Sequence, residues 1–333
     1  MRIKLLIGTG DPDYSEHLSS SISKHHADVI DATVCGTPER VRDALKARKY
    51  DAALLEAAMI EGADISQITL PLLLTTEDDR GAGMLPELKE IKKYQRISSI
   101  VADVLEQCAR VSSYGRSHDV TRARITAVWS PAGGVGATAV ALAYAAKKAS
   151  EGKQTLYLNL EPFSSVPAYF DETGKSISSV FEMLDSKEGD AQMLIRGIQR
   201  QDACGITYFC RPVNFDDMNV LSAGNISSLI GACAGVTDEL VVDLSCVCDE
   251  RTRRVFDIAD RVYLVTDSTR TALVKVSQFA TQHKIFESIR EKAVLVENKG
   301  AETGIPYTET SIRLPLIQSA DPSVVYKALS ANF

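Results

Sequence analysis

Residues 130–140 read SPAGGVGATAV, and this stretch constrains the fold more than any other part of the chain. It lies between the apolar run ITAVW at 125–129 and a helix predicted over 138–150. In a strand, glycine turn and helix of this kind, successive backbone N–H groups form an anion-binding nest, and the helix N-terminus adds partial positive charge. The alternative is a tight turn that only needs the backbone freedom of glycine. The motif alone leaves both interpretations open.

The pattern of apolar runs on either side of this loop predicts two α/β domains. Before it, strands are expected at 4–8, 27–34, 51–57, 71–76 and 91–95. After it, strands are expected at 125–130, 154–160, 206–210, 239–245, 261–267 and 293–299. Helical patterns lie between the strands, which implies largely parallel sheets covered on both faces. We expect an α/β domain at 1–111, a polar linker at 112–124 and a larger α/β domain at 125–333; the family resemblances given below imply that the first is flavodoxin-like and the second is of the P-loop NTPase type.

Composition excludes several classes of protein. The net charge of −7 disfavours nonspecific attraction to nucleic acid or anionic lipid, because both require cationic surface. No apolar run approaches the roughly 18 residues of a membrane span, and the apolar run near Met1 is too short for a signal peptide. The seven cysteines form no C-x-x-C pair, which fits reduced thiols rather than zinc ligands. We expect a cytoplasmic protein without nucleic-acid partners.

The glycine loop resembles the deviant Walker A loop of the ParA and MinD family, KGGVGKT. The GGVG core and the final threonine are preserved, but Ala132 and Ala137 stand where the family has its signature lysine and its phosphate lysine. The resemblance implies that Thr138 ligates Mg²⁺. It also implies a phosphate site formed by Gly133, Gly134, Val135, Gly136, Ala137, Thr138 and Ala139.

Other segments resemble the same family in their order along the chain. NLE at 159–161 falls where the family has D-x-D after its second strand, with Asn159 in place of the first aspartate. Asp243 matches the aspartate that supports Mg²⁺ or its water shell. Asn298 resembles the asparagine that reads adenine, and the loop IPYTET at 305–310 lies where relatives cover the base. The nucleotide site implied by the resemblance therefore also includes Glu161, Asp243, Asn298, Lys299 and Pro306.

The missing lysines change the expected chemistry more than the expected binding. Removing one preorganised charge-stabilising donor costs on the order of 10²–10³ in rate, and two are missing here. The backbone nest, Thr138 and the base contacts remain, so we expect ATP or ADP to bind with Mg²⁺ and to be hydrolysed weakly at most. In the family the signature lysine reaches the partner's nucleotide across a dimer. A homodimer of this chain would have to form without that contact.

The first domain resembles a response-regulator receiver that lacks its acceptor aspartate. In GTGDPDY, Thr9 and Gly10 stand at the usual acidic pair and Asp11 lies just beyond. Glu56 stands at the phosphoacceptor position, and Thr75 or Thr76 and Lys93 fill the remaining roles. Two interpretations stay open: a fold held in an activated-like form by the charge of Glu56, or an interaction module in which Glu56 only ends a strand. We favour the module.

The two domains together resemble the TadZ/CpaE family of tight-adherence pilus assembly proteins. That resemblance implies a scaffold in the cytoplasm, often polar and at the inner face of the membrane, that recruits pilus components including the secretion ATPase. The main alternative is an active ParA/MinD-type ATPase that positions DNA or the division machinery. A phosphorylation-controlled signalling protein would need the aspartate that Glu56 replaces. The segment at 321–333 is expected to pack on its own domain rather than bind lipid, so membrane contact would be indirect.

Overall fold

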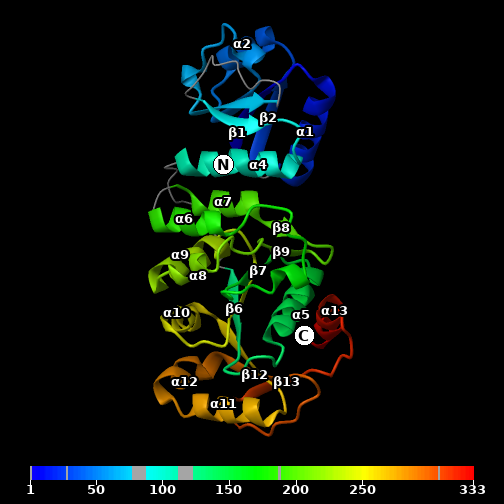
Figure 1. The fold of residues 1–333 in the computed structure, drawn as a ribbon, viewed down its shortest axis with the longest axis vertical. Coiled ribbons are helices and arrows are strands. Elements are labelled where there is room, and N and C mark those ends of the chain that lie inside the picture. Colours follow the sequence, from blue (N-terminus) through cyan, green and yellow to red (C-terminus); the bar gives the residue numbers. More distant parts are fainter. Residues whose placement is uncertain (1, 28, 77–87, 112–122, 187–188, 307) are drawn as a thin grey trace. The chain divides into compact units, whose positions relative to one another are not determined.

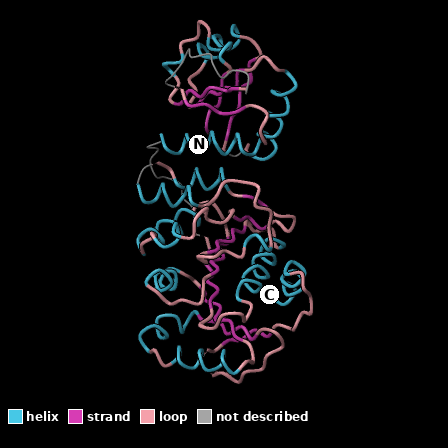
Figure 2. The backbone as a smooth tube through the Cα atoms, in the orientation of Figure 1, coloured by secondary structure: helices cyan, strands magenta, loops and turns pink. Residues whose placement is uncertain are grey.

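The computed structural model describes residues 2–27, 29–76, 88–111, 123–186, 189–306 and 308–333 (Figures 1 and 2). The chain divides into two compact units. Unit 1 comprises Met1–Gly115 and Glu188–Gly197, and unit 2 comprises Arg116–Lys187 and Ile198–Phe333. The assignment of residues 188–197 to the first unit was not predicted from the sequence. Most of the predicted linker, residues 112–122, lies outside the described residues, and Arg124 already begins a strand.

Unit 1 contains a parallel sheet in the order β2-β1-β3-β4-β5, which is the flavodoxin-like order of doubly wound folds. Its strands are β1 (Ile3–Gly8), β2 (Ile30–Cys35), β3 (Ala52–Leu55), β4 (Leu70–Thr75) and β5 (Lys89–Lys92). Its helices are α1 (Pro12–His25), α2 (Pro38–Ala47), α3 (Ala57–Ile60), α4 (Ile97–Val111) and most of α7 (Ala191–Ile198). Helices α1 and α2 each begin at a proline, with Asp11 and Thr37 as their N-caps.

Successive side chains of β1 point to opposite faces of this sheet, and different helices pack on each face. Leu5 and Ile7 join a buried cluster with residues of α1 and α4. Leu6, between them, points to the opposite face and packs with Val41 of α2 and Met59 of α3. Both faces are therefore covered. Full burial of each such aliphatic side chain contributes about 1.5–3 kcal/mol relative to exposure.

Helix α7 packs against α4, although it lies far from it in sequence. Met193 packs against the apolar cluster of α1 and α4, and the Asp190 N–H donates to the Ala109 carbonyl at 2.9 Å. The closest approach is at Gly197, where an added Cβ would lie 2.8 Å from Leu105 Cβ. The absence of a side chain at Gly197 therefore allows this helix to lie on α4.

Unit 2 contains a larger sheet in the order β13-β12-β11-β6-β10-β7-β9-β8, in which β8 alone pairs antiparallel with its neighbour. Its strands are β6 (Arg124–Trp129), β7 (Thr155–Asn159), β8 (Arg200–Gln201), β9 (Ile206–Tyr208), β10 (Glu239–Asp243), β11 (Arg261–Thr266), β12 (Ala293–Glu297) and β13 (Thr310–Arg313). Its helices are α5 (Ala137–Ser150), α6 (Ser178–Ser186), α8 (Asp216–Asn219), α9 (Ala223–Ala234), α10 (Glu250–Ile258), α11 (Arg270–Ala280), α12 (His283–Ile289) and α13 (Pro322–Leu329).

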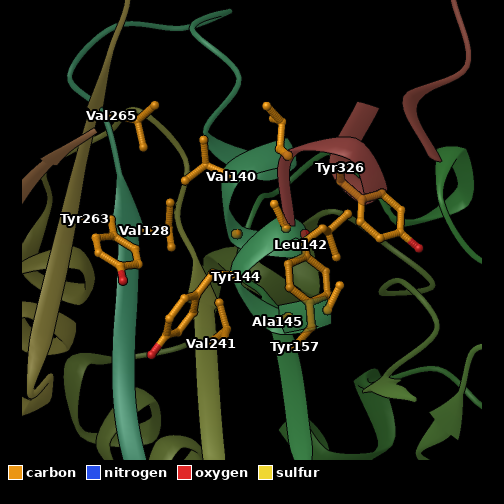
Figure 3. Close-up of a cluster of buried hydrophobic side chains, with 14 of the residues drawn as sticks. Val128, Val140, Leu142, Tyr144, Ala145, Tyr157, Val241, Tyr263, Val265 and Tyr326 are labelled. Atoms are coloured by element: carbon orange, nitrogen blue, oxygen red, sulfur yellow. The ribbon is translucent and has the colours of Figure 1, made fainter. Parts of the chain in front are cut away.

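Helices cover both faces of this sheet, with α5 and α13 on one side and α9 and α10 on the other (Figure 1). Helix α5 is rich in alanine and is buried over its central turns, Val140 to Ala146, so it lies close against the strands. Figure 3 shows its residues Val140, Leu142 and Tyr144 packed among strand residues and Tyr326 of α13. Because Tyr326 and Leu329 are buried in this core, the predicted packing of the C-terminal helix on its own domain is confirmed.

The predicted fold class is confirmed. The described structure is α/β with mostly parallel sheets, and each predicted strand after residue 125 is present with small shifts of its ends. Within the described residues, no helix is long and apolar enough to cross a membrane.

Candidate nucleotide site

The glycine loop joins β6, in the middle of the unit 2 sheet, to the first turn of α5. Gly134 and Gly136 have φ of 78° and 89°, in the left-handed region that favours glycine. Gly136 is the N-cap of α5 and, as a glycine, makes no side-chain capping hydrogen bond. The N–H groups at the start of α5 are thus left available to an anion, as in a phosphate-binding loop.

The two alanines that replace lysines lie in apolar surroundings. Ala132 is 6% exposed and belongs with Val135 to the buried cluster beneath the loop, and Ala137 packs against the same cluster. The Ala132 N–H is held by the Ser130 hydroxyl at 3.0 Å. The loop is therefore built with apolar contacts at position 132, and its backbone supplies the polar groups.

Asp243 ends β10 beside the loop and is fully buried. Its Oδ2 accepts hydrogen bonds from the Tyr157 hydroxyl at 2.7 Å and from Asn159 Nδ2 at 3.2 Å. Among the described residues, its Oδ1 has no hydrogen-bond partner. Burial raises the pKa of Asp243 to about 7, and the charge of Glu161 adds to this; Tyr157 and the Thr138 hydroxyl oppose it. An unpartnered carboxylate oxygen beside a threonine hydroxyl fits the oxygen donor set that Mg²⁺ prefers.

Asn159 and Glu161 lie together at the end of β7, next to Asp243. Asn159 Nδ2 is 3.1 Å from Glu161 Oε2, which also accepts a hydrogen bond from the Ser165 hydroxyl at 2.8 Å. The amide of Asn159 thus bridges two carboxylates. It adds no negative charge at this position and has no basic atom that could accept a proton from water.

Asn298 and Lys299 contact the loop from the end of β12. Asn298 is 4% exposed, and its Nδ2 donates to the Val135 carbonyl at 2.8 Å. Lys299 Nζ donates to the Gly134 carbonyl at 2.7 Å and lies 3.0 Å from Asp267 Oδ2. Burial opposes ionisation of Asp267, but hydrogen bonds from Thr269 and Lys299 outweigh it and hold the pKa of Asp267 below its usual range.

The structure brings the predicted residues of the loop, Thr138, Glu161, Asp243, Asn298 and Lys299 to the carboxyl edge of one sheet. A contact of Asn298 with a base stays a prediction, as does the role of Pro306, which is exposed in the loop between β12 and β13. Tyr157 and Asp267 were not predicted. Asp267 directly follows the strand RVYLVT, much as Asp243 ends ELVVD. This position at the end of a buried strand was the signal that could have identified it.

The residues of unit 1 on which the resemblance to a receiver rests also meet at the carboxyl edge of their sheet. Glu56 Oε1 accepts hydrogen bonds from the Thr9 hydroxyl at 2.6 Å and from Lys93 Nζ at 2.7 Å, and Oε2 accepts one from the Gly10 N–H at 2.8 Å. Burial opposes ionisation of Glu56, but these hydrogen bonds dominate and lower its pKa. Both oxygens of the carboxylate at the acceptor position are therefore already paired within the unit.

Two tyrosines enclose the cation of this cluster. Lys93 Nζ lies 4.9 Å from the ring centroids of both Tyr14 and Tyr94, and 3.4 Å from Asp11 Oδ2. Burial alone would lower the pKa of Lys93, yet the hydrogen bond with Glu56 raises it above its usual value. Thr75 contributes its carbonyl, which accepts the Lys93 backbone N–H at 2.7 Å. The cluster pairs two carboxylates, those of Glu56 and Asp11, with the single ammonium of Lys93. Among the described residues no group of three or more metal-ligand side chains is present.

Comparison with known proteins gives a structural likeness only. No family model matches the chain, and no curated protein matches it. The chain is similar to the crystal structure of a ParA family ATPase from Chlorobium tepidum, with a TM-score of 0.52, 16% identity and coverage of 63% of this chain and 99% of that one. It is also similar to the cell division ATPase MinD of Pyrococcus furiosus, with a TM-score of 0.47, 13% identity and coverage of 63% and 97%. A putative plasmid partition protein from Borrelia burgdorferi bound to AMPPNP has a TM-score of 0.46, 13% identity and coverage of 64% and 98%. The chain therefore contains the fold of the ParA family ATPase.

Proposed function

We propose that the chain is a nucleotide-binding scaffold that holds ATP or ADP with Mg²⁺ and hydrolyses ATP slowly at most. One observation carries this proposal. The loop keeps the backbone geometry of a phosphate nest, while no lysine lies within it and Asn159 replaces an acidic residue beside Asp243. Ground-state binding needs the amides and the metal, whereas phosphoryl transfer needs charge stabilisation that these side chains do not supply.

Thr138 and Asp243 are the proposed Mg²⁺ residues. A bound Mg²⁺ would supply positive charge at the phosphate oxygens. The other residues of the chain have simpler roles in the proposal: the loop amides bind phosphate, Asn159 holds Asp243 in place, and Asn298 fixes the loop beside the base.

Calorimetry with Mg·ATP and Mg·ADP tests the proposed nucleotide binding, and a phosphate-release assay tests the proposed lack of hydrolysis. Trp129, the single tryptophan, ends β6 directly before the loop and provides an intrinsic fluorescence signal for the same titration. We expect binding at micromolar to millimolar nucleotide and no turnover above background. Absence of binding at millimolar nucleotide would contradict the nucleotide site, and steady turnover typical of a partitioning motor would favour the alternative of an active positioning ATPase.

We further propose that this scaffold serves tight-adherence pilus assembly as a homodimer and that unit 1 is a receiver-like interaction module that needs no phosphorylation. The resemblance to TadZ/CpaE proteins supports the pilus role, and the paired state of Glu56 supports the module. Co-purification with the pilus secretion ATPase of the same cell, and mass measurement in solution with and without Mg·ATP, test these two statements. A strict monomer in both conditions would exclude the dimer, and labelling of unit 1 by a small phosphodonor would exclude the module.

A further inference from the structure

The outer side of the glycine loop is bound by two side chains from one short segment. Lys299 donates to the Gly134 carbonyl at 2.7 Å and Asn298 donates to the Val135 carbonyl at 2.8 Å. Each carbonyl belongs to the same peptide group as the next N–H in the chain, which is that of Val135 or Gly136. Any group that binds these carbonyls therefore acts on the N–H groups at the heart of the nest.

The segment that carries these two residues is itself firmly held. Asn298 is 4% exposed, and its backbone N–H donates to the Thr266 carbonyl at 2.8 Å. Lys299 has φ of 59°, an unfavourable conformation for a residue with a side chain. Its ammonium is paired with Asp267, whose side chain is 6% exposed. The conformation of the segment thus places two donors against two adjacent loop carbonyls.

We propose that Asn298 and Lys299 are positioning residues of the phosphate loop and that Lys299 supplies, through the peptide group, part of the positive charge that Ala132 and Ala137 no longer provide. This inference rests on the proposed nucleotide-binding function. A hydrogen bond to a peptide carbonyl polarises that peptide and strengthens its N–H as a donor, by about 10–30%. A cationic donor has a larger effect than a neutral one. Fixing the loop before the ligand arrives also reduces the entropy lost on binding.

The test compares Lys299→Met, which keeps the length of the side chain without its charge, with Lys299→Arg, which keeps the charge. Lys275→Met, at an exposed position of α11, is the matched control. Each protein is titrated with inorganic tripolyphosphate, ADP and adenosine in the presence of Mg²⁺. We expect Lys299→Met to weaken tripolyphosphate and ADP roughly tenfold and to leave adenosine unchanged, because only the phosphate contacts depend on the polarised loop. Lys299→Arg should stay within about threefold of the unmodified chain.

A second measurement needs no ligand. The ¹H–¹⁵N resonances and hydrogen exchange of the Val135 and Gly136 amides report the polarisation and order of the loop directly. We expect Lys299→Met to shift both resonances and to speed exchange at both amides, with recovery in Lys299→Arg and no change in Lys275→Met. Unchanged amides and unchanged tripolyphosphate affinity in Lys299→Met would overturn the inference while leaving the proposed function intact.

Two further outcomes separate the proposals. If ADP and adenosine weaken in parallel in Lys299→Met, then Lys299 contacts the base and the inference is wrong. If the unmodified chain binds neither ATP nor tripolyphosphate, the proposed function fails. The amide measurements would then decide alone whether Lys299 positions the loop.

Discussion

A Cβ atom at Gly136 would lie 2.5 Å from Asn298 Nδ2, so the glycine loop meets the end of β12 at a position where only glycine fits. The φ of Gly136, 89°, also lies in the left-handed region. Space and backbone conformation impose the same requirement at this residue. Gly133, three residues earlier, has no atom within 4 Å of the corresponding Cβ position, and its φ lies outside the left-handed range.

Gly136→Ala is expected to destabilise unit 2 by about 2 kcal/mol or more, from backbone strain and the displaced Asn298 amide. Nucleotide affinity should fall with it, because the nest loses its shape. Thermal unfolding and ADP titration measure the two effects. Gly133→Ala is the control and should leave unfolding nearly unchanged. Equal behaviour of the two variants would contradict this view of the loop.

In the absence of metal, Asp243→Asn is expected to be more stable than the unmodified chain, by a margin that grows as the pH rises. The folded-state pKa of about 7 lies above the usual 3.8, so the native form keeps its proton longer than the unfolded chain does. Stability of the unmodified chain therefore falls between these two pH values and stays low above pH 7. The unmodified chain thereby loses free energy of unfolding, approaching about 4 kcal/mol at pH 8, and Asp243→Asn does not lose it. Urea unfolding at pH 5 and pH 8 measures it, and Asp185→Asn, an exposed aspartate of α6, should show no such trend.

Ala137→Lys is expected to tighten ADP binding by about tenfold through a charge-assisted hydrogen bond. Turnover should stay at background, because Asn159 is bound to Asp243 and cannot accept a proton. Adding Asn159→Asp to the same chain should raise phosphate release by roughly 10² or more. Ser150→Lys, at the far end of α5, adds the same charge as a control. Steady turnover by Ala137→Lys alone would show that the acidic residue is dispensable.

Glu56→Gln is expected to destabilise unit 1 by about 2 kcal/mol at neutral pH, because the buried ammonium of Lys93 loses the nearer of its two carboxylate partners and keeps only Asp11, at 3.4 Å. The folded-state pKa of Glu56 is lowered, so its contribution is present above the usual value of 4.5 and is lost as the pH falls through the folded-state pKa. The difference between the two proteins should shrink in acid. Hydrogen exchange of β1 at pH 7 and below pH 4.5 measures it, with exposed Glu90→Gln as the control. A difference that grows in acid would exclude the ion pair as its source.

Gly197→Ala is expected to loosen α7 from α4, since its new methyl group would lie within 2.8 Å of Leu105. Overpacking of this kind costs about 1–3 kcal/mol. Gly231→Ala, in α9, meets no atom within 4 Å and should be neutral or slightly stabilising. Hydrogen-exchange rates of the backbone amides of residues 191–198, measured in both variants, test this expectation. Unchanged protection in Gly197→Ala would mean that the helix does not depend on this contact.

Much of this architecture could be predicted because strands and caps are local signals. Buried strands such as LVVD and RVYLVT are continuous apolar runs, and a threonine followed by proline, as at Thr37-Pro38, is a local signal for a helix start, at which α2 begins. The meeting of Glu56 with Lys93 follows from topology, since the carboxyl ends of parallel strands share one edge. The covering of both faces follows from the alternation of strands and helices, whereas the order of strands in each sheet was not predicted.

What could not be predicted depends on contacts between distant segments. The fifth strand was expected at 91–95 but ends at Lys92, because Tyr94 takes a φ of 61° and turns the chain. Strand β13 is short and polar, since it lies at an edge of the sheet. Nothing local in Asn298 or Lys299 announces that their side chains bind loop carbonyls more than 160 residues away.

The position of α7 has a consequence for how such a protein can be divided. Unit 1 is not one contiguous coding segment, because the helix that lies on Leu105 is encoded after the glycine loop. A gene fragment that stops at residue 111 would omit this helix and leave the facing side of α4 bare and prone to aggregate. Recombination that joins a new domain after residue 111 would likewise separate α7 from α4. The two units are therefore expected to be inherited together.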